Sequence, residues 1–198
     1  VAALRKLVAE ADVFEGTLKL SLLKGAADSQ LFVYARPPLP VPESRFLWLD
    51  PDAPIFERSP LAGHKTHNYM EAMHRLHLAR ARGYYDALRL DSQGRLAETT
   101  TRLCTPALDT GVLPGVTRAL LLRNPGLGVQ TGHYTLEDLK NAETLFLTNA
   151  TRGIEIMGCL EGLPDGNRID FNTAHPALEK ICAVYETSRN ATNRRETG

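Results

Sequence analysis

The most constraining feature of the sequence is a lysine placed between a tight turn and a helix. Residues 59–63 read Ser-Pro-Leu-Ala-Gly, and Lys65 follows after one histidine. Apolar side chains then recur every three to four residues from 68 to 82, which predicts an amphipathic helix ended by Gly83. Such a lysine can be held inside a pocket. A lysine beside histidines is more often an ordinary solvated one. The other segments of the sequence therefore have to show whether Lys65 has a functional role.

The segments before this turn predict a smaller domain. They are, in order, a helix at 1–10, a strand at 17–24, a turn at 25–28 and a strand at 30–35. The prolines between 36 and 43 predict an extended connection, and residues 46–49 form a short apolar run. We therefore assign residues 1–58 to a small N-terminal domain and linker, and residues 59–198 to a large C-terminal domain.

The segments after the turn alternate between strands and helices. The predicted elements are strands at 86–90 and 95–99, helices at 117–122 and 136–141, a strand at 144–147, a hairpin or loop at 158–172 and a helix at 176–189. Thr135 and Asp138 have the spacing of a capping box at the start of the second helix. The polar residues 190–198 predict a frayed end.

The composition narrows the class of protein. The 23 basic and 23 acidic residues balance, which does not favour a nucleic-acid or membrane-surface partner. No apolar run approaches the roughly 20 residues of a membrane span. The three cysteines are far apart, and His74 and His77 lack a third ligand, so neither a disulfide framework nor a metal site is predicted. We expect a cytoplasmic protein.

Two turns of small residues are candidate ligand sites. Residues 111–117 form a glycine-flanked turn that opens a helix, where main-chain N–H groups and the helix dipole favour a phosphate. Residues 148–150, Thr-Asn-Ala, follow a predicted strand, and small side chains there let a ligand approach the backbone. Ordinary helix starts and strand ends have the same features, so each turn alone is a weak signal.

Taken together and in order, the segments 59–69, 86–101, 105–118 and 136–154 resemble the class IV aminotransferase family, the fold-type IV pyridoxal-phosphate enzymes. The resemblance runs from about Arg58 to the last helix. It implies a two-domain α/β (α+β) fold like that of D-amino-acid aminotransferase. It also implies pyridoxal 5'-phosphate as cofactor, a small-molecule substrate and a homodimer.

The resemblance assigns three roles around the cofactor ring. Lys65 would bind the cofactor aldehyde covalently, and its freed amine would move protons at the substrate carbon. Glu98 would pair with the pyridine nitrogen and keep it protonated. Tyr69 would touch the phenolic oxygen, as a tyrosine shortly after the lysine does in branched-chain aminotransferases, although the spacing here is one residue shorter.

The resemblance also assigns the phosphate contacts. Val116 and Thr117, at the start of a helix, would bind the phosphate through main-chain N–H groups and a hydroxyl. The turn at Asn149 and Ala150 would add a further phosphate contact.

The sequence departs from the family pattern in two places. The usual N-terminal segment, which supplies an arginine to the phosphate, does not precede Val1. Thr101 leads almost directly to Thr105 and Pro106, where the family has a further strand and turn. Deleting a central strand would leave buried backbone groups unpaired at about 1–3 kcal/mol each. This cost favours an incomplete record of a longer chain over a family member that has lost parts of its site.

Two features bear on the reaction. The residues after Lys65 lack the Gly-Gly of branched-chain aminotransferases, and the turn at Asn149 and Ala150 resembles that of aminodeoxychorismate lyases. The resemblance therefore favours 4-amino-4-deoxychorismate lyase, which releases 4-aminobenzoate and pyruvate in folate biosynthesis. An amino-acid aminotransferase (branched-chain or D-amino acid) with a 2-oxo acid acceptor is the alternative, and a non-catalytic homodimer is a further one.

Overall fold

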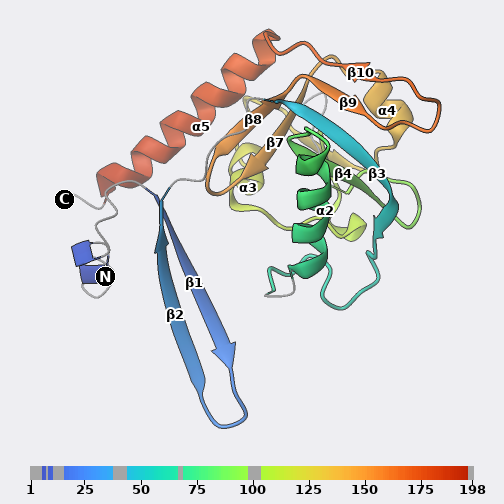
Figure 1. Cartoon of the computed structure of the whole chain (residues 1–198). Coiled ribbons are helices and arrows are strands. Elements are labelled where there is room, and N and C mark those ends of the chain that lie inside the picture. Colours follow the sequence, from blue (N-terminus) through green and yellow to red (C-terminus); the bar gives the residue numbers. More distant parts are fainter. Residues whose placement is uncertain are drawn as a thin grey trace. The chain divides into compact units, whose positions relative to one another are not determined.

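The computed structural model describes residues 6–7, 9–10, 16–37, 44–66, 69–97 and 104–195, with side chains of the last helix described to 190 (Figure 1). The chain divides into two compact units, Val1–Pro42 and Glu43–Gly198. This division falls ahead of the boundary that we placed after residue 58, and the functional assignment of the two domains stays a prediction. Among the described residues, no helix is both long and apolar enough to cross a membrane.

The first unit contains a β-hairpin of β1 (Thr17–Lys24) and β2 (Ser29–Arg36). The strands are antiparallel and pair in unbroken register from Thr17 opposite Arg36 to Lys24 opposite Ser29. The turn between them is closed by a hydrogen bond from the Gly25 N–H to the Asp28 carbonyl (2.7 Å). Both strands and the turn were predicted, the first strand from the alternation of apolar and polar side chains and the turn from the residues at 25–28.

The second unit holds the remaining elements. In chain order they are β3 (Phe46–Ile55), α2 (Met70–Ala81), β4 (Asp86–Asp91), β5 (Cys104–Pro106), η1 (Leu108–Thr110), α3 (Val116–Leu122), β6 (Gln130–Gly132), α4 (Leu136–Lys140), β7 (Leu145–Asn149), β8 (Gly153–Met157), β9 (Cys159–Glu161), β10 (Ile169–Asp170) and α5 (Pro176–Arg195). The predicted helices of this unit and most of its predicted strands are confirmed. Residues 6–7 and 9–10 of the helix predicted at 1–10 are helical, and the rest of that segment lies outside the described residues. Residues 190–195, predicted to fray, continue the last helix.

The main sheet has the strand order β10-β9-β3-β4. β3 pairs in parallel with both β4 and β9, and α2 connects β3 to β4 and packs against both strands. The pairing of β3 with β4 is irregular between Asp50 and Ile55. Pro51 and Pro54 lie in this interval and have no N–H to donate, which accounts for the interruption. The apolar run predicted at 46–49 is thus the first half of a longer strand.

The remaining strands of this unit form two separate two-stranded sheets. β5 pairs in parallel with β6, and β7 pairs antiparallel with β8. The predicted capping box is confirmed, because the Asp138 N–H donates to the Thr135 hydroxyl and the Asp138 carboxylate accepts from the Thr135 N–H. The predicted strand at 95–99 is not a regular strand in its described part, where Arg95 and Leu96 form only isolated bridges.

Two apolar clusters hold the second unit together. The larger one lies against the main sheet and includes Leu47, Leu88, Leu139 and Leu160, each at most 2% exposed. The smaller one joins α3, β7 and α5 through Leu121, Phe146, Leu178 and Ile181. Burial of each such side chain contributes about 1.5–3 kcal/mol. The second cluster therefore fixes α3 and β7, the two elements that carry the predicted phosphate residues.

Candidate active site

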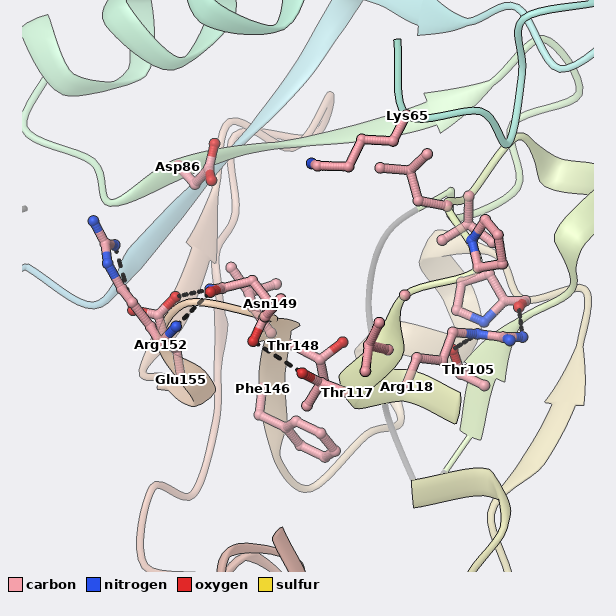
Figure 2. Close-up of a pocket in the computed structure, with 18 of the residues that line it drawn as sticks. Lys65, Asp86, Thr105, Thr117, Arg118, Phe146, Thr148, Asn149, Arg152 and Glu155 are labelled. Carbon is pink, nitrogen blue, oxygen red and sulfur yellow. Dashed lines mark hydrogen bonds and ion pairs between the residues drawn. The ribbon is translucent and has the colours of Figure 1, made fainter. Parts of the chain in front are cut away.

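One pocket of about 470 Å³ in the second unit gathers most of the predicted site residues (Figure 2). Its walls come from the loop before α2, the start of β4, the segment from β5 to α3, and the β7–β8 turn. The residues named by the sequence that line it are Lys65, Val116, Thr117, Asn149 and Ala150. Lys65 and Ala150 are 85 residues apart in the sequence, so these residues meet only in the folded chain.

Lys65 reaches the pocket from the turn that the sequence predicted. The turn is closed by hydrogen bonds from the Ala62 N–H to the Ser59 carbonyl (2.9 Å) and from the His64 N–H to the Leu61 carbonyl (3.1 Å). The Lys65 side chain extends toward the carboxyl group of Asp86 (Figure 2). Its ammonium group lies 5.1 Å from the centre of the Tyr69 ring, within the range of a cation–π contact. Tyr69 thus faces the lysine, although it does not line the pocket.

The start of α3 forms one wall of the pocket. The first N–H groups of an α-helix have no partner within the helix. Gly115 precedes α3 and has no side chain that could cap these groups. Val116 is 75% exposed, whereas Thr117 is only 4% exposed. The Thr117 hydroxyl donates to the main-chain carbonyl of Asn149 (2.9 Å). While that bond is made, its proton is not available to a phosphate.

The β7–β8 turn is organised by the side chain of Asn149. The Asn149 amide oxygen accepts from the N–H groups of Thr151 (3.0 Å) and Arg152 (2.6 Å). Its amide nitrogen donates to Glu155 (2.7 Å). This arrangement leaves the small side chain of Ala150 at the pocket wall, as a close approach of ligand to backbone requires.

Several polar residues of the pocket were not predicted. Arg118 donates to the Thr105 hydroxyl (2.9 Å) and to the Pro106 carbonyl (2.8 Å), and so ties α3 to β5. Burial lowers the pKa of this guanidinium from its ordinary value. Burial also raises the pKa of Asp86, which lies across the pocket from Lys65. Arg118 and Asp86 are charged residues that lie close to turns in the sequence. Charged residues near turns are too common in sequences for this position to identify either one as a site residue.

Tyr85 and Glu155 form a second unpredicted group. The Tyr85 hydroxyl donates to the carboxylate of Glu155, a side chain that is 6% exposed. Burial and this hydrogen bond raise the pKa of Tyr85. Glu155 stands between Ile154 and Ile156 in an alternating strand, and a charge on the inward face of such a strand is the signal that could have identified it.

Glu98, predicted to contact the pyridine nitrogen, lies outside the described residues, as do the residues next to Thr101 where the sequence departs from the family pattern. The last described residue before Glu98 is Ala97, which is fully buried. The role of Glu98 stays a prediction.

The family follows from the comparison with known proteins. The model of the family described as "Amino-transferase class IV" matches residues 2–156. The chain belongs to the class IV aminotransferase family. This confirms the resemblance inferred from the sequence, and the family is one of pyridoxal-phosphate-dependent enzymes.

Two curated relatives share the same name. Aminodeoxychorismate lyase of Bacillus subtilis (strain 168) is 47% identical over 49 residues, or 23% of this chain and 17% of the relative. Aminodeoxychorismate lyase of Vibrio harveyi is 31% identical over 127 residues, or 56% of this chain and 45% of the relative. The chain thus spans less than half the length of either curated relative in these matches.

Solved structures of the family have the same fold. A Legionella pneumophila protein provisionally assigned as a 4-amino-4-deoxychorismate lyase matches with a TM-score of 0.80 at 24% identity, covering 94% of this chain and 75% of that one. A hypothetical aminotransferase from Mycobacterium tuberculosis, in its PLP-bound form, matches with a TM-score of 0.71 at 20% identity, covering 93% and 72%. The predicted α/β fold of fold type IV is confirmed.

Proposed function

We propose that the pocket binds pyridoxal phosphate, with Lys65 as the residue that holds the cofactor covalently. The observation that carries this proposal is the convergence of Lys65 with the start of α3 and the β7–β8 turn around one pocket. The residues around the pocket fit the cofactor in three respects. Its volume of about 470 Å³ lies within the range of small-molecule sites, an amine enters it, and uncapped N–H groups stand at its wall.

The parts played by the protein follow from these positions. Pyridoxal phosphate, when bound, supplies an electron sink for the substrate carbon. The main-chain N–H groups of Val116 and Thr117 and the turn at Asn149 and Ala150 would hold the phosphate. The Lys65 amine, once released from the cofactor, would remove and return protons at the substrate carbon.

For the reaction we propose the lyase that converts 4-amino-4-deoxychorismate to 4-aminobenzoate and pyruvate. Support comes from the two curated relatives of that name and from the Asn149–Ala150 turn. An amino-acid aminotransferase with a 2-oxo acid acceptor is the second candidate, because the matched family model is named for that activity.

The decisive test uses the purified protein and two successive measurements. The visible spectrum with pyridoxal phosphate is recorded before and after borohydride reduction, and the reduced protein is mapped by peptide mass spectrometry. We expect a yellow species and a label on Lys65. A label scattered over surface lysines, or none, would overturn the cofactor proposal and favour a non-catalytic protein.

The second measurement separates the two reactions. The protein is supplied with aminodeoxychorismate, and 4-aminobenzoate is detected by fluorescence. Formation of 4-aminobenzoate supports the lyase, whereas transfer of an amino group to 2-oxoglutarate or pyruvate without it supports the aminotransferase. We further propose a homodimer, to be tested by light scattering of the eluting protein during size exclusion.

A further inference from the structure

Glu155 is a buried carboxylate with an unusual number of partners for a residue in the middle of a strand. Oε2 accepts from the Asn149 amide at 2.7 Å. Oε1 accepts from the Tyr85 hydroxyl and lies 3.4 Å from Nη1 of Arg152 and 3.6 Å from Nη1 of Arg45. A buried carboxylate without partners would be strongly destabilising, and these neighbouring groups offset that cost.

The bond from Asn149 to Glu155 determines which way the Asn149 amide points. An amide nitrogen only donates and an amide oxygen only accepts. Because the nitrogen faces Glu155, the oxygen faces the N–H groups of Thr151 and Arg152 and closes the turn. The main-chain carbonyl of Asn149 in turn accepts from Thr117, which joins the turn to α3. A continuous series of hydrogen bonds therefore runs from Glu155 to both walls proposed to hold the phosphate.

We propose that Glu155 is a positioning residue, which holds the turn at 149–152 in the geometry that binds the cofactor phosphate. The inference rests on the proposed function. Glu155 acts through Asn149 and is not assigned a contact with the phosphate itself. Tyr85 and the guanidinium groups of Arg45 and Arg152 hold the carboxylate in place for this task.

The Glu155→Gln substitution tests this role while keeping the side-chain shape. A carboxylate accepts with both oxygens, whereas a glutamine accepts with one oxygen and donates with its nitrogen. The guanidinium groups of Arg45 and Arg152 only donate, so we expect the glutamine oxygen to face them and its nitrogen to face Asn149. There the nitrogen sets a donor against the amide nitrogen of Asn149. The Asn149 amide then loses its fixed direction.

The experiment compares the affinity of the cofactor-free protein for pyridoxal phosphate and for pyridoxal, which lacks the phosphate, by titration calorimetry. Glu161→Gln is a matched control, because Glu161 accepts from the Tyr84 hydroxyl (2.8 Å) on the neighbouring strand β9 and does not line the pocket. For Glu155→Gln we expect affinity for pyridoxal phosphate to fall about tenfold. Affinity for pyridoxal should change less than about twofold in both variants.

The outcomes separate the inference from the proposed function. If the parent protein itself shows no preference for pyridoxal phosphate over pyridoxal, the cofactor proposal fails and the inference fails with it. If the parent prefers pyridoxal phosphate and Glu155→Gln keeps that preference, only the positioning role of Glu155 is overturned. An equal loss of affinity for both ligands would likewise overturn it, since a general disturbance of the pocket would explain that result.

A measurement without ligand covers the case in which binding is too weak to compare. The N–H groups of Thr151 and Arg152 are protected by Asn149, so their hydrogen exchange reports the order of the turn. Glu155→Gln should increase exchange of these two amides at least about tenfold. Glu161→Gln should leave it unchanged. Unchanged exchange in both variants would contradict the proposal.

Discussion

The Thr117 hydroxyl donates to the main-chain carbonyl of Asn149 at 2.9 Å, and this one bond joins the first turn of α3 to the end of β7. Thr117 is buried, so its hydroxyl proton has no competing water. The two elements come from segments more than 30 residues apart in the sequence. Together with the packing of Leu121 against Phe146, this bond sets the distance between the main-chain groups that the two elements place at the pocket.

Thr117→Val should remove this hydrogen bond with little change in side-chain shape. The Asn149 carbonyl would lose its donor, which we expect to lower the free energy of unfolding by about 1 kcal/mol. Affinity for pyridoxal phosphate should fall about tenfold. Calorimetric titration and urea unfolding measure the two effects. Thr187→Val is the control, because Thr187 donates to Ala183 within the exposed face of α5. Equal affinities for both variants would contradict the role given to Thr117.

Lys65→Ala should remove the borohydride-trapped label and lower turnover by about 10³-fold, since the proton-transfer group is lost. The control is Lys180→Ala, which removes an ammonium group that donates to the Gly126 carbonyl at 2.6 Å. That variant should keep both the label and the turnover. Retained labelling of the Lys65→Ala protein at another single lysine would show that the cofactor lysine had been assigned wrongly.

Gly153→Ala should destabilise the protein by about 3 kcal/mol, for two reasons that can be separated. Gly153 has a φ of +74°, and a Cβ there would lie 2.5 Å from the Tyr185 ring of α5. Gly128 has a similar φ of +61°, but a Cβ there would meet nothing within 4 Å. Gly128→Ala should therefore cost only the backbone strain of about 1 kcal/mol. Equal unfolding free energies of the two variants would show that a Cβ at position 153 does not clash with the Tyr185 ring of α5.

Glu57 should make the free energy of unfolding depend on pH in the acidic range. A hydrogen bond from the Ser92 hydroxyl (2.7 Å) is the main cause that lowers the pKa of Glu57 from 4.5 to about 2. Because the pKa is lower in the folded protein, the unfolded chain takes up the proton first as the pH falls. The stabilisation is thus fully present above about pH 4.5 and is lost as the pH falls to about 2.

Urea unfolding of the parent and of Glu57→Gln at several pH values tests this expectation. The variant cannot titrate at this position, so the difference in unfolding free energy between the two proteins should shrink as the pH is lowered from 5 to about 2. A constant difference would mean that Glu57 titrates alike in the folded and unfolded chains.

The elements predicted well are those whose signal is local. The helix that follows Lys65 and the capping box at Thr135 were confirmed, because spacing and capping residues act within a few positions. The prediction for β3 stopped at residue 49, because Pro51 and Pro54 usually interrupt strands. Its continuation depends on pairing with β4, which a sequence pattern does not reveal. β8 was not predicted, although it follows directly on the predicted turn.

The pocket was predicted only where the family motifs name its residues. Lys65, Thr117 and Asn149 were found through those motifs, and all three line it. Tyr85 and Glu155 were missed because their partnership spans 70 residues and arises from the packing of β8 near the start of β4. The position of Glu155 on the inward face of β8 indicates a buried charge, but it does not indicate which distant residue would be its partner.

The crossover from β3 through α2 to β4 contains Lys65, whereas every predicted phosphate residue follows β5. The pocket therefore exists only when two consecutive stretches of the chain have docked on each other. A ligand that touches both stretches stabilises their docked form by an amount that grows with its concentration relative to its dissociation constant. Resistance of the loop around Lys65 to proteolysis should then rise with the concentration of such a ligand, so that cofactor supply would govern how long the chain survives.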